Sequence, residues 1–146
     1  LGGASGGYIA ARQEIVDMLR QKARPYLFSN AVPPPVAAAS IKAIELARTN
    51  TALRTQLAAN AKQFRDGMTK LGFDLIPGHH PIVPVMLGDA AVAVKMSDNL
   101  YKNGVYATAF FYPVVPQGKA RIRTQMSACH TSEEIDFAIQ AFAKSR

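Results

Sequence analysis

Residues 118–136 read GKARIRTQMSACHTSEEID, and this stretch decides the fold. Its first half alternates in character, which is typical of a strand whose two faces meet different surroundings. One face would carry Ala120, Ile122, Thr124 and Met126, and the opposite face would carry Arg121, Arg123 and Gln125. In the second half, Thr131 and Glu134 have the spacing of a capping box at a helix start. We therefore expect a strand over residues 121–126 and a helix over residues 131–144.

The two arginines of this strand are candidates for binding a carboxylate. Arg121 and Arg123 are separated by one residue, so both would lie on the same face of the strand. A guanidinium is a planar fork of donors that matches the two oxygens of a carboxylate. By spacing alone, however, an arginine pair on a solvated sheet face is the commoner arrangement.

Outward from this stretch, apolar spacing and the positions of Gly and Pro predict the other elements. Helices are expected over 12–22, 35–48, 51–70 and 89–103, and strands over 73–76, 82–87 and 105–110. The resulting order is helices followed by β-β-α-β-β-α. This order predicts an α+β fold, with a small, mostly antiparallel sheet, helices on one face and long connecting helices before it.

The composition limits the classes of protein that fit. The chain has 146 residues and a formal net charge of +7, but its basic residues are mixed with acidic ones, so no nucleic-acid partner is expected. No apolar run approaches the length of a membrane span. Cys129 is the only cysteine, which excludes an internal disulfide, and we expect it to be a small buried residue. His79 and His80 are adjacent in an expected loop, and no metal site is indicated.

Several segments of the chain resemble one enzyme family. They are LGGASGGY (1–8), FSNAVPP (28–34), PVMLGD (84–89) and YPVVPQGKARIRTQMSA (112–128). They are similar to the α-oxoamine synthases, which are fold-type-I enzymes that depend on pyridoxal 5'-phosphate (PLP). The resemblance covers essentially the whole chain and implies the C-terminal domain of a PLP-transferase fold. Residues 1–32 would form the cofactor and interface region, and residues 33–146 the helical connector and the small C-terminal domain.

The resemblance also implies roles for individual residues. Arg123 would pair with the carboxylate of the amino-acid substrate, whereas Arg121 does not match the carboxylate arginine of the family and is expected to be structural. Ser29 and Asn30, which propensity alone reads as turn or capping residues, would reach across a dimer interface to the PLP phosphate of the neighbouring subunit. The lysine that binds PLP as a Schiff base would lie upstream of Leu1. No catalytic residue is therefore expected within this chain.

The implied activity is that of an acyltransferase. The segments favour the branch that condenses glycine with acetyl-CoA to 2-amino-3-ketobutyrate and CoA, in threonine degradation and glycine metabolism, as a homodimer. As a C-terminal fragment, the chain is expected to be inactive by itself. Two alternatives stay open: another α-oxoamine synthase, of the 8-amino-7-oxononanoate or 5-aminolevulinate type, or a non-enzymatic α+β module that binds a small ligand. The expected compartment is the cytoplasm or, alternatively, the mitochondrial matrix.

Overall fold

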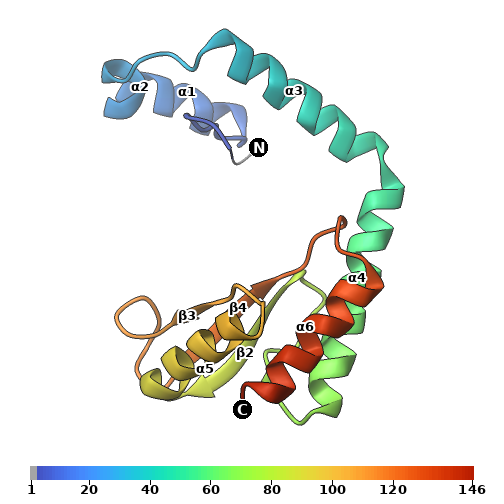
Figure 1. The fold of residues 1–146 in the computed structure, drawn as a ribbon. Coiled ribbons are helices and arrows are strands. Elements are labelled where there is room, and N and C mark those ends of the chain that lie inside the picture. Colours follow the sequence, from blue (N-terminus) through green and yellow to red (C-terminus); the bar gives the residue numbers. More distant parts are fainter. Residues whose placement is uncertain (1–2) are drawn as a thin grey trace. The chain divides into compact units, whose positions relative to one another are not determined.

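The computed structural model describes residues 3–146. The chain divides into two compact units, Leu1–Thr51 and Ala52–Arg146 (Figure 1). The sequence-based division into residues 1–32 and 33–146 follows the expected roles of the two segments rather than their packing, and it stays a prediction.

The described part of the first unit contains α1 (Gln13–Lys22), α2 (Arg24–Phe28) and α3 (Pro34–Thr49). Both α1 and α3 lie where the sequence predicts helices. The short helix α2 was not predicted, because Pro25 indicated a break. In the structure this proline lies in the first turn of α2, where its missing N–H loses no hydrogen bond. None of these helices holds a buried residue, so the described residues of this unit form no hydrophobic core among themselves.

The second unit contains a four-stranded antiparallel sheet in the order β1-β2-β4-β3. The strands are β1 (Asp74–Leu75), β2 (Ile82–Gly88), β3 (Thr108–Phe110) and β4 (Ala120–Gln125). β4 is a central strand, since it pairs with β2 on one side and with β3 on the other. The predicted α+β class and the mostly antiparallel sheet are confirmed.

Three helices pack on one face of this sheet: α4 (Thr51–Lys70), α5 (Ala90–Lys102) and α6 (Ser132–Lys144). The side chain of Asp89 caps α5 by accepting the Val92 N–H at 3.0 Å. Thr131 and Glu134 make both hydrogen bonds of the predicted capping box, at 2.9 and 3.2 Å. The start of α6, directly after β4, is therefore fixed by local sequence.

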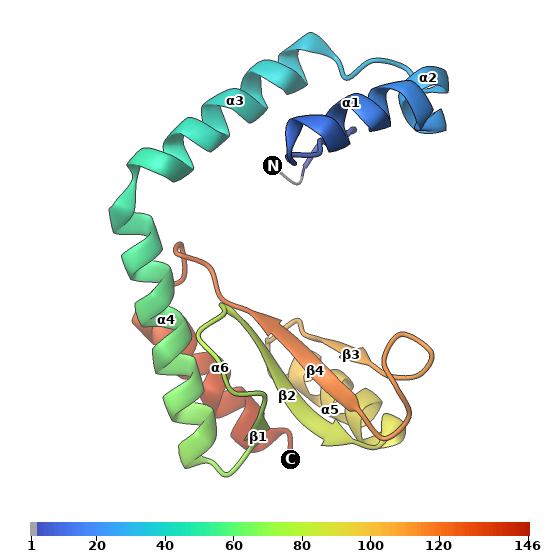
Figure 2. The ribbon, with the colours of Figure 1, turned by 180° about the vertical axis from the view of Figure 1, so that it is seen from behind.

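The core lies between these helices and the inner face of the sheet. Ile122 of β4 is fully buried, as the alternation of this strand predicts. Phe142 of α6 makes edge-to-face contacts with Phe64 and Phe73, at centroid distances of 5.9 and 5.8 Å. In Figure 2 the strands β2 and β4 lie in front of α5, so this view shows the face of the sheet opposite the core.

β3 begins later than predicted, because the chain before it is bound to α5. The Val105 N–H donates to the Leu100 carbonyl at 2.9 Å. The Ala107 carbonyl accepts the Ser97 hydroxyl at 2.7 Å. These main-chain groups are therefore hydrogen-bonded to α5 and do not pair with β4. As a result, β3 is only three residues long.

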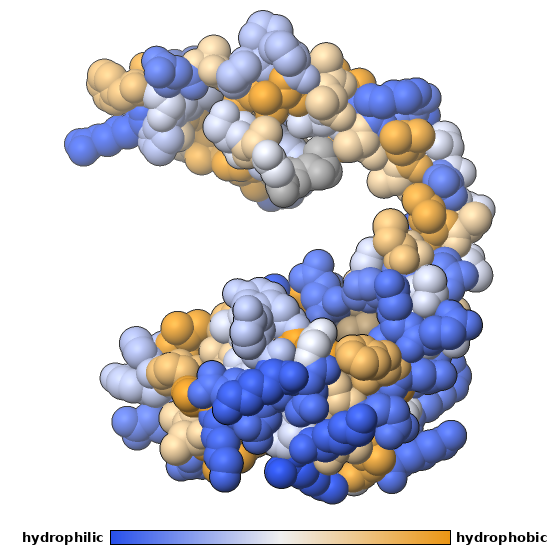
Figure 3. Space-filling model, viewed as in Figure 1, coloured by the Kyte–Doolittle hydropathy of each residue, from blue (hydrophilic) through white to orange (hydrophobic). Residues whose placement is uncertain are grey.

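Two arginines of the second unit use their charge to hold main chain. Arg65 of α4 donates to the carbonyls of Ile76 (2.8 Å), His80 (3.1 Å) and Ile82 (3.4 Å), and so fixes the β1–β2 loop. Arg146 donates to two carbonyls just beyond α4, at 2.9 and 3.1 Å. Elsewhere hydrophilic residues are spread over the visible face of this unit, with apolar patches between them (Figure 3).

Cys129 is exposed, so the prediction that it is buried is wrong. The alternation that buries the side chain of Met126 ends with that residue, and the next residues form the loop into α6. In this loop the Cys129 N–H donates to the Ser127 hydroxyl at 3.1 Å. A side chain in such a turn no longer alternates toward the core, and this one stays at the surface.

Candidate functional site

Arg123 lies in β4 and projects from the sheet face opposite the core. Its register partners are Pro84 on β2 and Thr108 on β3. The preceding residue, Ile122, is fully buried on the inner face, and Arg123 itself is exposed. The period-two geometry of the strand therefore sets the direction of the guanidinium.

The guanidinium of Arg123 contacts the ring of Phe110, and this contact occupies none of its N–H donors. Its Cζ atom lies 5.7 Å from the ring centroid of Phe110, a cation–π contact from the neighbouring strand. Among the described residues no carboxylate forms an ion pair with it. Arg121 differs, because it is half-buried and its Nε donates to the Lys119 carbonyl at 3.1 Å. Of the two arginines, only Arg121 donates a hydrogen bond to the protein's own main chain among the described residues.

A cavity of about 610 Å³ opens beside Arg123. It exists because β3 begins only at Thr108, which pairs with Arg123, so the last residues of β4 have no strand partner on that side. Arg123, Gln125, His130 and Glu134 contribute to its lining, together with apolar residues that include Phe137. The cavity therefore combines charged and polar residues with apolar walls, as many small-molecule sites do.

His130 was not selected from the sequence as a site residue, although it lines the same cavity as Arg123. Its Nδ1 accepts the Ser127 N–H at 3.2 Å, which leaves Nε2 as the protonated nitrogen of the neutral ring. The available signal was its position directly before the capping residue Thr131, in the loop that leaves the arginine strand. The local sequence predicts that His130 lies in this loop, but it does not predict the cavity, because residues far apart in the chain form it.

Ser29 and Asn30 belong to the first unit, so the structure describes them separately from Arg123. Ser29 ends α2, and its N–H donates to the Pro25 carbonyl at 2.9 Å. Both residues are exposed, and their side chains make no hydrogen bond within the described part of the chain. A hydroxyl and an amide are thus presented next to each other, and both can donate to an anionic oxygen.

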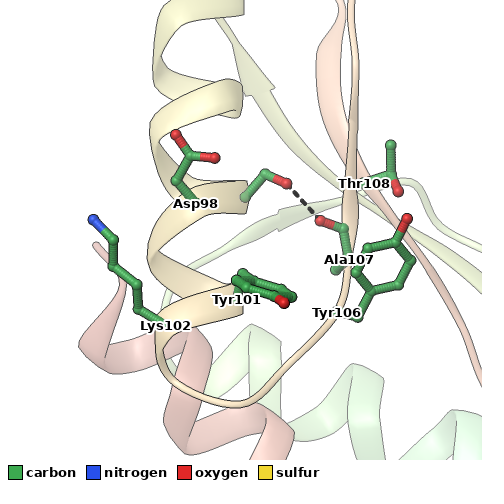
Figure 4. Close-up of a pocket in the computed structure, with 7 residues that line it drawn as sticks. Asp98, Tyr101, Lys102, Tyr106, Ala107 and Thr108 are labelled. Carbon is green, nitrogen blue, oxygen red and sulfur yellow. Dashed lines mark hydrogen bonds between the residues drawn. The ribbon is translucent and has the colours of Figure 1, made fainter.

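A smaller hollow of about 370 Å³ lies between α5 and the segment that leads to β3 (Figure 4). Tyr101 and Lys102 come from α5, and Tyr106 comes from the segment. The hydrogen bond drawn there is the Ser97–Ala107 contact that shortens β3. Within residues 3–146 no group of three or more His, Cys, Asp or Glu residues could hold a metal ion, and no helix is long and apolar enough to span a bilayer.

The family profile described as aminotransferase class I and II matches residues 2–142. The chain belongs to this family. Among aminotransferase class I and II relatives, the 2-amino-3-ketobutyrate coenzyme A ligase of Escherichia coli K12 is 58% identical over 144 residues. The mitochondrial human ligase of the same name is 48% identical over 144 residues. The 8-amino-7-oxononanoate synthase of Thermosipho melanesiensis is 45% identical over 142 residues.

These alignments cover nearly the whole chain but only about a third of the relatives. The match to the Escherichia coli ligase covers 99% of this chain and 36% of that protein. Among solved structures, a high-resolution structure of SPT with the PLP internal aldimine has a TM-score of 0.85 and 29% identity, and the match covers 91% of this chain and 34% of that one. The folded units described above are therefore those of an aminotransferase class I and II protein.

Proposed function

We propose that this chain is the C-terminal part of a PLP-dependent acyltransferase that condenses glycine with acetyl-CoA to 2-amino-3-ketobutyrate and CoA. The exposed guanidinium of Arg123, free of any ion pair among the described residues, carries the proposal. The 58% identity with a ligase of that name supports the choice of reaction. Because the chain spans 36% of that relative, the activity is that of a longer protein, and we expect none from these 146 residues alone.

The residues of the first unit fit a role in holding PLP. Ser29 and Asn30 are exposed, adjacent and uncharged, and their side-chain donors have no partner within the described part of the chain. Such donors suit the oxygens of a phosphate. We therefore assign them to the cofactor phosphate, contributed across a homodimer interface. When bound, PLP supplies stabilisation of the carbanion at the amino-acid α-carbon, and the protein supplies orientation.

Arg123 orients the substrate in this proposal. Two parallel N–H groups of its guanidinium bind the two carboxylate oxygens of glycine, which fixes both the position and the plane of the carboxylate. The ring of Phe110, 5.7 Å from Cζ, contacts the guanidinium. The pairing of β4 with both neighbouring strands fixes the backbone that carries it. A fixed carboxylate in turn sets which bond of the α-carbon faces the cofactor. This is a geometric role, and charge alone does not fill it.

The test is Arg123→Lys in the full-length protein, with Arg121→Lys as the matched control. The lysine keeps the charge but cannot bind both oxygens in one plane. We expect kcat/KM for glycine to fall by about 10- to 100-fold, which corresponds to the loss of one hydrogen bond to a charged group. Arg121→Lys should change it little, since Arg121 donates to the chain's own Lys119 carbonyl. Steady-state kinetics with normal glycine parameters for Arg123→Lys would remove the proposed role.

A second candidate function is another reaction of the same family. The 45% identity with an 8-amino-7-oxononanoate synthase keeps it open. A panel of acyl-CoA donors and amino acids decides between the two, since both use Arg123 in the same way. A purely ligand-binding module is the third possibility, and the absence of acyl transfer with every donor would favour it. We place the protein in the cytoplasm or the mitochondrial matrix, and the name of the human relative supports the second compartment.

A further inference from the structure

Asn60 is a polar residue inside the core face of α4. It is 2% exposed, among the most buried side chains of the second unit. A buried amide without partners would destabilise the fold, but this one is satisfied. Its Nδ2 donates to the Ser127 carbonyl and to the His130 carbonyl, both at 2.9 Å, and its Oδ1 accepts the Gln56 Nε2 at 2.8 Å.

The two carbonyls lie in the loop of residues 126–131 that joins β4 to α6, each one residue in from an end of the loop. The loop is also closed on itself, since the Ser127 N–H donates to His130 Nδ1 at 3.2 Å. One amide of α4 therefore holds this loop at two points. The contact joins positions 67 and 70 residues apart in the sequence.

The loop matters because the end of β4 is supported by a strand on one side only. On the β2 side the ladder continues to Gln125, and the Met126 N–H still donates to the Pro81 carbonyl at 2.9 Å. On the β3 side pairing stops at Arg123, and the cavity begins there. The hydrogen bonds from Asn60 hold the chain just beyond this end, at Ser127 and at His130, and His130 itself lines the cavity.

We propose that Asn60 is a positioning residue for substrate binding. Its buried amide holds the β4–α6 loop, and with it His130, which lines the cavity beside Arg123, so that this wall of the cavity keeps the geometry that accepts a carboxylate. The inference rests on the proposed role of Arg123. Asn60 touches no substrate in this account and acts through main chain alone.

The test compares Asn60→Asp with Asn99→Asp in the full-length protein. Asn60→Asp keeps the size of the side chain and loses both donors. Asn99→Asp is the matched control, because Asn99 donates to the Ser145 carbonyl at 3.3 Å, far along α6 from the loop. We expect the KM for glycine to rise about tenfold in Asn60→Asp, with the KM for acetyl-CoA unchanged, since small displacements of a positioning group weaken binding strongly. A merely structural role would lower the stability of Asn60→Asp but leave its glycine KM as unchanged as that of the control.

Arg123→Lys, measured in parallel, separates the two proposals. If Arg123→Lys raises the glycine KM and Asn60→Asp behaves as the Asn99 control, the positioning role is overturned and the proposed function stands. If Arg123→Lys changes nothing, the proposed function itself fails. Should Asn60→Asp not fold, Gln56→Ala decides, because it removes only the donor that orients the Asn60 amide. A glycine KM raised two- to threefold supports the positioning role, on the order expected for one lost neutral hydrogen bond, and an unchanged KM overturns it.

Discussion

Gly67 of α4 lies close against Ile139 of α6, and Gly67→Ala gives a sharp test of that packing. A Cβ at this position would lie 2.5 Å from Cδ1 of Ile139, 3.1 Å from Cγ1 and 3.2 Å from Cγ2. Rotation could remove the first contact but not the other two, since both γ atoms are attached to a stiff, branched Cβ. Two effects of opposite sign then compete. Alanine gains about 1 kcal/mol of helix propensity over glycine, whereas overpacking costs about 1–3 kcal/mol.

We expect overpacking to win, so that Gly67→Ala destabilises the second unit by about 1 kcal/mol. In an Ile139→Ala background all three contacting atoms are absent, and the same change should then stabilise by about 1 kcal/mol. The coupling free energy of the cycle is thus about 2 kcal/mol. Urea unfolding followed by circular dichroism measures it, provided that the m value is unchanged. A stabilising Gly67→Ala in both backgrounds would refute the close approach of the two helices.

Two further predictions concern the start of α6. Thr131→Ala removes the cap and should destabilise the second unit by about 1 kcal/mol in thermal unfolding. Thr69→Ala in α4 is the control. Equal effects of the two substitutions would contradict the capping role. The pKa of Glu133 lies below its ordinary value, because a backbone hydrogen bond at Glu133 and then the Thr131 hydroxyl favour its carboxylate. Since folding lowers this pKa, the carboxylate favours the folded state above its unfolded-state pKa, and this contribution is lost as pH falls through the folded-state pKa. An NMR titration should show a low midpoint that rises in Thr131→Ala, and an identical midpoint in both proteins would rule out the hydroxyl as a cause.

Much of this fold could be predicted because its signals are local. The alternation around Arg123 gave the strand and the face that carries the guanidinium, and the Thr131 capping box gave the start of α6. The extent of β3 could not be predicted, because it depends on which partner binds its main-chain groups. In the same way, the exposure of Cys129 could not be predicted from the alternation of the strand, since Cys129 lies in a loop, where side chains do not alternate regularly between two faces.

The candidate site, too, could be predicted only as far as local sequence determines it. The face of Arg123 follows from the sequence, whereas its surroundings depend on contacts between distant segments. Asn60 shows the difficulty, because it lies three residues after Leu57 and four before Phe64, inside an apolar helical stripe. A polar residue at such a position signals a buried hydrogen bond. Its partners, however, lie in a loop 67 to 70 residues further along the chain, and no local sequence pattern predicts which residues they are.

The contacts of Arg65 bear on how freely the sequence of the β1–β2 loop can change. This guanidinium recognises three carbonyl oxygens, which every amino acid possesses, rather than any side chain of the loop. The contact therefore constrains the length and path of the loop and leaves the identity of most of its residues open. Among homologous proteins, substitutions should accumulate there faster than length changes. The exceptions are Gly78, which has a positive φ, and His80, whose Nδ1 accepts the Ile82 N–H at 3.0 Å.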